Sequence, residues 1–234
     1  MIPLSDDPKS RSFPVVTVVL IIINVVVFLY EIGLGGRSEA FVQAFGAVPA
    51  EIVSGRDVPP AAPFGNVYLT LFTSMFLHGG FLHIASNMIY LWVFGDNVED
   101  AFGHVGYLIF YLVCGLIAGL AQIAIDPTSR IPSIGASGAI AGVLGAYLVI
   151  FGSAQVRTLV FLGPIIFLPR IPAMFLIGFW FVTQLISGLG ALTDRTQQTG
   201  GVAFWAHIGG FVAGVVLALL FRPRVAPASS YRGY

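Results

Sequence analysis

Residues 135–152 read GASGAIAGVLGAYLVIFG, an apolar run without a charged residue that is long enough to form a helix inside a membrane. Gly138 and Gly142 lie four residues apart in this run, and Gly210 and Gly214 repeat the spacing near the end of the chain. Small residues at this spacing let two helix backbones approach closely in lipid. We therefore predict that the helices carrying these glycines dock against each other and organise the fold.

The composition places the whole chain in a membrane. Of its 234 residues, 57% are hydrophobic and only 9% are charged, and the mean hydropathy is +0.91. Soluble domains carry about 25% charged residues, so we expect one polytopic domain surrounded by lipid. The formal net charge of zero gives no electrostatic reason to expect a nucleic acid partner. The single cysteine, Cys114, offers neither an intrachain disulfide nor a metal site.

Six segments approach the roughly 20 apolar residues that a membrane span needs. We predict an all-α, six-helix bundle over residues 14–222, a cytoplasmic segment at 1–13 and a flexible tail at 223–234. The long first loop is mixed and Pro-rich up to Asn66 and then apolar over 67–77, so we expect it to dip partly into the membrane. An interfacial hairpin is predicted at 157–170. The six expected helices are 14–34, 81–101, 105–125, 135–152, 171–190 and 202–221.

The distribution of cationic residues predicts the orientation. With both termini in the cytoplasm, the inner side holds seven Lys and Arg residues and the outer side four, in keeping with the positive-inside rule. The second, fourth and sixth helices then begin at the outer face. Four polar residues near these helix starts can reach one cavity that opens outward: His83, Asn87, Ser137 and His207.

Ser137 and His207 have the chemistry of a base-activated nucleophile. A serine hydroxyl attacks only when a base removes its proton, and histidine titrates in the right range to do so. Gly135 allows a tight backbone before the helix and a close approach of substrate. His83 and Asn87 share one face of a helix at i and i+4, which suits donors to an oxyanion. No carboxylate is placed to orient His207, so a dyad is expected.

Other chemistries lack the residues they need. The soluble nucleophile elbow requires GxSxG, and Ala139 occupies the last position. No zinc-protease His pair, facing aspartate pair or Gly-Lys phosphate loop is present in the sequence. His78 and His104 are interpreted as structural or interfacial, and Glu99 as a cap or loop anchor on the inner face. Two alternatives stay open: a non-catalytic protein that binds transmembrane clients, and a transporter, for which we find no repeated halves.

The ordered motifs resemble those of the rhomboid intramembrane serine proteases. They run from HGGFLHIASN (78–87) and VEDAFG (98–103) to GASG (135–138) and AHIGGFVAG (206–214). The resemblance implies six core helices, Ser137 as nucleophile, His207 as general base, His83 and Asn87 as oxyanion donors, and no metal or organic cofactor. Many members carry an aromatic residue four positions after the serine that stacks on the histidine. This chain has Ala141 there, so other groups must orient His207.

The resemblance implies two kinds of partner, transmembrane protein substrates and membrane lipid, and it leaves the oligomeric state open. We expect a substrate helix to enter sideways near the fifth helix and the connection from Ser187 to Phe204. Local unwinding must then expose a peptide bond, because a regular helix shields its carbonyls. The polar residues 194–201 are predicted to form a cap over the site.

Overall fold

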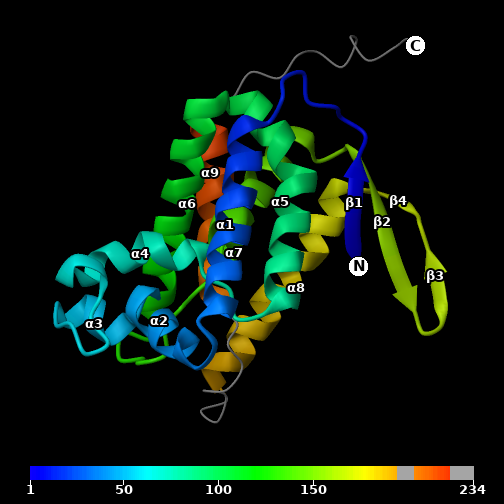
Figure 1. Ribbon diagram of the computed structural model, residues 1–234. Coiled ribbons are helices and arrows are strands. Elements are labelled where there is room, and N and C mark those ends of the chain that lie inside the picture. Colours follow the sequence, from blue (N-terminus) through cyan, green and yellow to red (C-terminus); the bar gives the residue numbers. More distant parts are fainter. Residues whose placement is uncertain (194–202, 222–234) are drawn as a thin grey trace.

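The computed structural model describes residues 1–193 and 203–221. All six predicted helices are present, each within three residues of its expected bounds. They alternate in direction, so that α5, α7 and α9 all begin toward the lower end of the molecule in Figure 1. The predicted tail at 223–234 lies outside the described residues. The long helices are α1 (Val15–Gly33), α5 (Phe81–Phe102), α6 (His104–Ile125), α7 (Ser137–Phe151), α8 (Ala173–Thr193) and α9 (Phe204–Phe221).

Helix length and hydropathy identify an integral membrane protein. Within the described residues, α1, α6, α8 and α9 are long and apolar enough to cross a bilayer. A fifth candidate joins the short helices of Val67–Phe76 to α5 across a bend of 79°. Helix α7 has only 15 residues, about 22 Å at 1.5 Å per residue, which is less than the roughly 30 Å of a hydrocarbon core.

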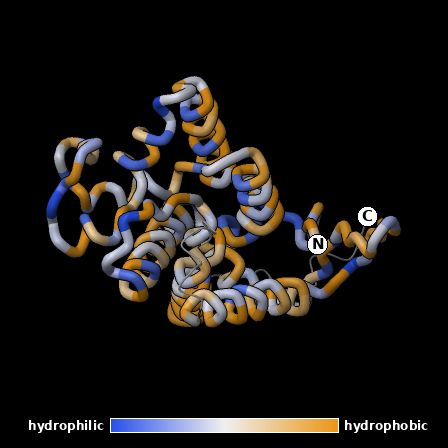
Figure 2. Tube along the Cα trace, turned by 90° about the horizontal axis from the view of Figure 1, so that it is seen from below, coloured by the Kyte–Doolittle hydropathy of each residue, from blue (hydrophilic) through white to orange (hydrophobic). Residues whose placement is uncertain are grey.

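Helix α7 can be short because it lies inside the bundle. Every residue from Gly138 to Tyr147 is buried, and α5, α6 and α9 all pack against it. The outer helices instead expose large hydrophobic side chains, as expected of surfaces that face lipid. Hydrophobic residues accordingly occur on all sides of the bundle helices in Figure 2. Helix α7 therefore lies in the interior of the bundle over most of its length.

A small antiparallel sheet lies beside the helices and corrects the all-α expectation (Figure 1). The predicted hairpin is present: β2 (Gln155–Leu162) pairs with β3 (Ile165–Phe167), and Gly163 takes a positive φ of 60° in the two-residue turn. The strand β4 (Arg170–Pro172) pairs with the start of β2. The strand β1 (Ile2–Asp6) pairs with the other edge of β2. Sequence reasoning missed β1 because five residues carry little periodicity.

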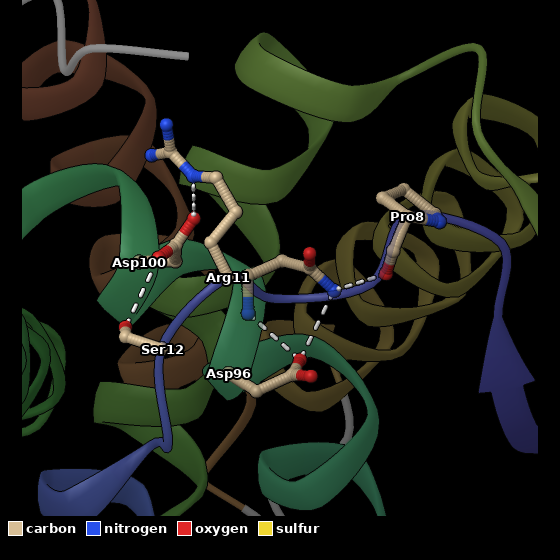
Figure 3. A network of polar contacts seen from close by, with 6 residues as sticks. Pro8, Arg11, Ser12, Asp96 and Asp100 are labelled. Carbon is tan, nitrogen blue, oxygen red and sulfur yellow. Dashed lines mark hydrogen bonds and ion pairs between the residues drawn. The ribbon is translucent and has the colours of Figure 1, made fainter. Parts of the chain in front are cut away.

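Polar contacts fasten the segment before α1 to the end of α5 (Figure 3). Arg11 Nε donates to Asp100 Oδ2 at 2.8 Å, and Ser12 Oγ donates to Asp100 Oδ1 at 3.0 Å. Asn97 Nδ2 donates to the carbonyl oxygen of Pro8 at 3.0 Å. These bonds hold residues that are far apart in sequence at one end of the bundle, opposite the starts of α5, α7 and α9.

Glu99 caps the first helix. No side chain caps α1 from within its own segment, where Pro14 stands at the N-cap. The fully buried carboxylate of Glu99 accepts hydrogen bonds from Val16 N at 2.8 Å and from Thr17 N at 2.7 Å. His104 Nδ1 lies 2.6 Å from the same carboxylate. Glu99 therefore satisfies amide groups at a helix start that would otherwise lack partners, and the expected cap is confirmed.

The segment between α1 and α5 is built from short helices on the flank of the bundle opposite the sheet (Figure 1). One bridge joins it to the connection before α7, where Ala47 N donates to the carbonyl of Ser133 at 3.1 Å. This segment therefore helps to position the start of α7. Its elements are 3-10 turns at Gly35–Arg37, Pro63–Gly65, Val67–Leu69 and Ser74–Phe76, and the helices α2 (Ser38–Phe45), α3 (Pro49–Ser54) and α4 (Thr70–Thr73).

Candidate active site

Glycines bring α7 and α9 into backbone contact. A Cβ added to Gly210 would overlap the carbonyl oxygen of Gly138, and one added to Gly214 would overlap that of Gly142. Helix α7 also packs closely against α6, where a Cβ on Gly142 would lie 2.5 Å from the side chain of Cys114. Since any side chain at these positions would separate the helices, the glycines set the distance between α7 and α9.

This close approach joins Ser137 to His207. Ser137 is the first residue of α7, and His207 lies in the first turn of α9. The Oγ of Ser137 and the Nε2 of His207 are 2.7 Å apart, and both side chains are half-buried. In this geometry Nε2 can accept the serine proton, which is the arrangement that activates a hydroxyl nucleophile.

The other ring nitrogen of His207 has a partner that sequence reasoning missed. Nδ1 lies 2.8 Å from Oε1 of Gln184, on α8. The indole of Trp180, one turn earlier on the same helix, lies against the imidazole with ring centroids 5.9 Å apart. Gln184 is the one amide side chain in α8, where the other polar residues are serine and threonine. An amide side chain within an apolar membrane helix is itself a functional signal, and it could have identified this position.

Gly135 brings the imidazole of His83 beside the start of α7. The φ of Gly135 is +122°, a region that favours glycine, and its N–H donates to the carbonyl of Ser74 at 2.8 Å. A Cβ added to Gly135 would lie 2.8 Å from Nε2 of His83 and 3.5 Å from Oγ of Ser137. The structure thus gathers His83 and Ser137 around one glycine that has no room for a side chain.

His83 presents a donor at this place, and Asn87 carries a further donor on the same helix. Nδ1 of His83 accepts a hydrogen bond from Gly79 N at 3.3 Å, so in the neutral ring Nε2 carries the proton. Asn87 is buried one turn further along α5, and within the described residues its Nδ2 group has no hydrogen-bond partner. No bond in that part of the chain joins Asn87 to Ser137 or His207.

The start of α7 supplies further donors. No side chain caps this helix, and its backbone bonding begins with Ile140 N donating to the carbonyl of Ala136 at 3.0 Å. The amides of the first turn are therefore available at the positive end of the helix dipole. A cavity of about 30 Å³, large enough for a water molecule, adjoins Ser137. Small residues account for much of its lining, among them Gly115, Ala118, Gly119, Gly135, Gly138 and Ala139.

The other two histidines make no hydrogen bond to Ser137 or His207 within the described residues. His78 is buried beside His83, with ring centroids 5.0 Å apart, and its backbone N–H donates to the carboxylate of Glu31 at 3.3 Å. His104 contacts Glu99 at the opposite end of the bundle. Within residues 1–193 and 203–221 no cluster of His, Cys, Asp and Glu has the geometry to bind a metal ion. The predicted cap at 194–201 lies outside these residues.

The sequence is similar to those of known proteins. A family profile described as the Rhomboid domain matches residues 65–224. The chain is 31% identical over 207 residues to "Rhomboid protease GluP" of Bacillus subtilis, an alignment that covers 88% of this chain and 35% of that protein. It is 33% identical over 156 residues to "RHOMBOID-like protein 5" of Arabidopsis thaliana, covering 66% and 45% respectively. The chain thus spans less than half the length of these two relatives.

Proposed function

The chain belongs to the rhomboid family, and from that premise we propose that it is an intramembrane serine endopeptidase that cleaves transmembrane segments of other proteins. Ser137 is the nucleophile and His207 the general base. The observation that carries this proposal is the 2.7 Å contact between Oγ of Ser137 and Nε2 of His207. Two separate helices, α7 and α9, bring this hydroxyl and this imidazole together.

The reaction follows from this geometry. Oγ of Ser137 attacks the carbonyl carbon of the scissile peptide bond while Nε2 of His207 takes the hydroxyl proton. The tetrahedral intermediate collapses, the C–N bond breaks, and the imidazolium returns the proton to the leaving amine. A water molecule then attacks the acyl-enzyme ester with His207 again as base. This second step releases the new carboxyl group and restores the serine hydroxyl.

We assign three sets of donors to the oxyanion. The first-turn amides of α7 stand at the positive end of the helix dipole, in the same turn as Ser137, which suits them to bind a negative charge. The Nε2–H group of His83, which lies beside Gly135, is the second donor. The unpartnered amide of Asn87 is the third donor. A buried amide without a partner costs free energy in the resting protein, and the oxyanion of the transition state supplies the missing acceptor.

We propose the following placement in the membrane. Residues 14–222 form six spans with both termini in the cytoplasm, and the first loop dips into the outer leaflet. The starts of α5, α7 and α9 then face outward, so that water reaches Ser137 from that side. Substrate enters between α8 and its neighbours, and small side chains near the cut fit the cavity of about 30 Å³ beside Ser137.

Labelling of the purified full chain by a fluorophosphonate tests the proposal directly. Wild-type protein in detergent should react covalently at Ser137, identified by mass spectrometry, and should cleave a reporter transmembrane substrate. Ser137→Ala and His207→Ala should each abolish labelling and cleavage, while the helical signal in circular dichroism stays at the wild-type level. Cleavage by the Ser137→Ala protein would show that another group is the nucleophile.

The same experiment separates the protease from a non-catalytic relative that binds transmembrane clients. A client binder would retain the reporter helix in a co-purification assay without cutting it, and it would not react with the probe. If the wild-type protein binds the reporter but neither reacts with the probe nor cleaves the reporter, the protein is a client binder and not an endopeptidase.

A further inference from the structure

The orientation of His207 needs an explanation in this chain, because Ala141 stands on α7 where an aromatic ring would otherwise support the imidazole. A general base needs one ring nitrogen free to accept a proton, and the hydrogen bond made by the other nitrogen determines which one that is. Two residues of α8 contact the imidazole of His207, namely Gln184 and Trp180.

Hydrogen-bond directions in this cluster select one tautomer. The hydroxyl of Thr183 donates to the carbonyl of Trp180 at 2.6 Å, so its oxygen is left to accept from Nε2 of Gln184 at 3.4 Å. That contact turns Oε1 of Gln184 toward Nδ1 of His207, at 2.8 Å. An amide oxygen can only accept, so Nδ1 must carry the ring proton. Nε2 is then unprotonated and faces Oγ of Ser137.

The opposite amide orientation would give the wrong tautomer. If the NH₂ group of Gln184 faced Nδ1, that nitrogen would have to accept, and the proton would move to Nε2. Nε2–H would then point at the hydroxyl of Ser137 and could not remove its proton. The bond from Gln184 to Thr183 therefore matters because it disfavours this flip.

Trp180 limits the tilt of the ring. Its indole lies at 39° to the imidazole of His207 with centroids 5.9 Å apart, and it also contacts Phe211 one turn further along α9. The imidazole thus has an aromatic ring beside it, although that ring comes from α8 and not from α7. Trp180 and Gln184 are four residues apart, so a single face of α8 provides both contacts.

We propose that Gln184 is a positioning residue of the dyad, whose carboxamide oxygen fixes the Nδ1-protonated tautomer of His207 while Trp180 supports the ring. This inference rests on the proposed function and extends the dyad to a third residue that acts through His207. It follows that α8 must rest on α9 for the base to be complete. A displacement of α8 that is large enough to admit a substrate helix breaks both contacts.

Substitutions at Gln184 test the role of its oxygen. Gln184→Leu keeps the approximate volume and removes the acceptor, and it should lower kcat by about 10- to 100-fold, with KM changed by no more than about twofold. Gln184→Glu can still accept from Nδ1, and it should restore kcat to within about threefold of wild type. Gln155→Leu makes the same chemical change in β2, at the end of α7 opposite Ser137, and should leave kcat at the wild-type value.

A spectroscopic measurement reports on the tautomer without relying on turnover. In protein with ¹⁵N-labelled histidine, the His207 signals are assigned by their loss in His207→Ala. Wild-type protein should show protonated Nδ1, whereas Gln184→Leu should show both tautomers. A wild-type tautomer and a wild-type kcat in Gln184→Leu would overturn the inference. Failure of the wild-type protein to react with the fluorophosphonate would instead overturn the proposed function, and the tautomer spectra would still decide the role of Gln184.

Discussion

The contact between Gly210 and Gly138 gives the most direct test of how the helices set the dyad. Gly210 lies three residues after His207, and Gly138 follows Ser137. In Gly210→Ala the new Cβ would overlap the carbonyl oxygen of Gly138, and an ordinary contact of about 3.5 Å requires the backbones to separate by about 1.5 Å. The 2.7 Å contact of the dyad would then lengthen to about 4.2 Å, beyond hydrogen-bond range.

We expect Gly210→Ala to lower the rate of reporter cleavage by at least about 100-fold, because a misplacement of about 1 Å can already cost that much. Overpacking should also lower the free energy of unfolding by about 1–3 kcal/mol. Gly145→Ala crowds Phe211 at the same helix interface about two turns away from Ser137. It should lower the unfolding temperature similarly while retaining more activity. Gly178→Ala on α8 has no atom within 4 Å of the added Cβ and should behave as wild type. Wild-type cleavage by Gly210→Ala would refute the reasoning.

Two further predictions concern the opposite end of the bundle. Burial raises the pKa of Asp6 to about 7, although its bond from Tyr147 opposes the shift. The folded state therefore holds this proton up to about pH 7, and attachment of β1 should weaken as the pH rises from about 4 to 7. After correction for intrinsic rates, the amides of β1 should exchange faster at pH 8 than at pH 5, and this difference should be absent in Asp6→Asn. Equal protection at the two pH values would contradict the prediction. Glu99→Gln turns an amide donor toward Val16 N or Thr17 N, and it should lower the free energy of unfolding by about 1–3 kcal/mol. An unchanged unfolding temperature would exclude the capping role.

The local sequence specifies the helices because the membrane makes hydrophobicity the dominant signal. Each of the six apolar runs folds as a helix, since lipid offers no other partner to the backbone of an isolated segment. The sheet was harder to foresee. The apolar run before Arg170 is too short to span and forms the predicted hairpin, but the pairing of β1 with β2 joins residues more than 140 positions apart and has no local signature.

The sequence by itself determined that Ser137 and His207 lie near helix starts, and that glycines spaced by four can bring those helices together. Only the tertiary structure decided that the hydroxyl and the imidazole are 2.7 Å apart, and that Gln184 on α8 faces the second ring nitrogen. Spacing along one helix fixes which residues share a face. The partner that this face meets depends on how several helices pack, and that packing is a property of the whole bundle.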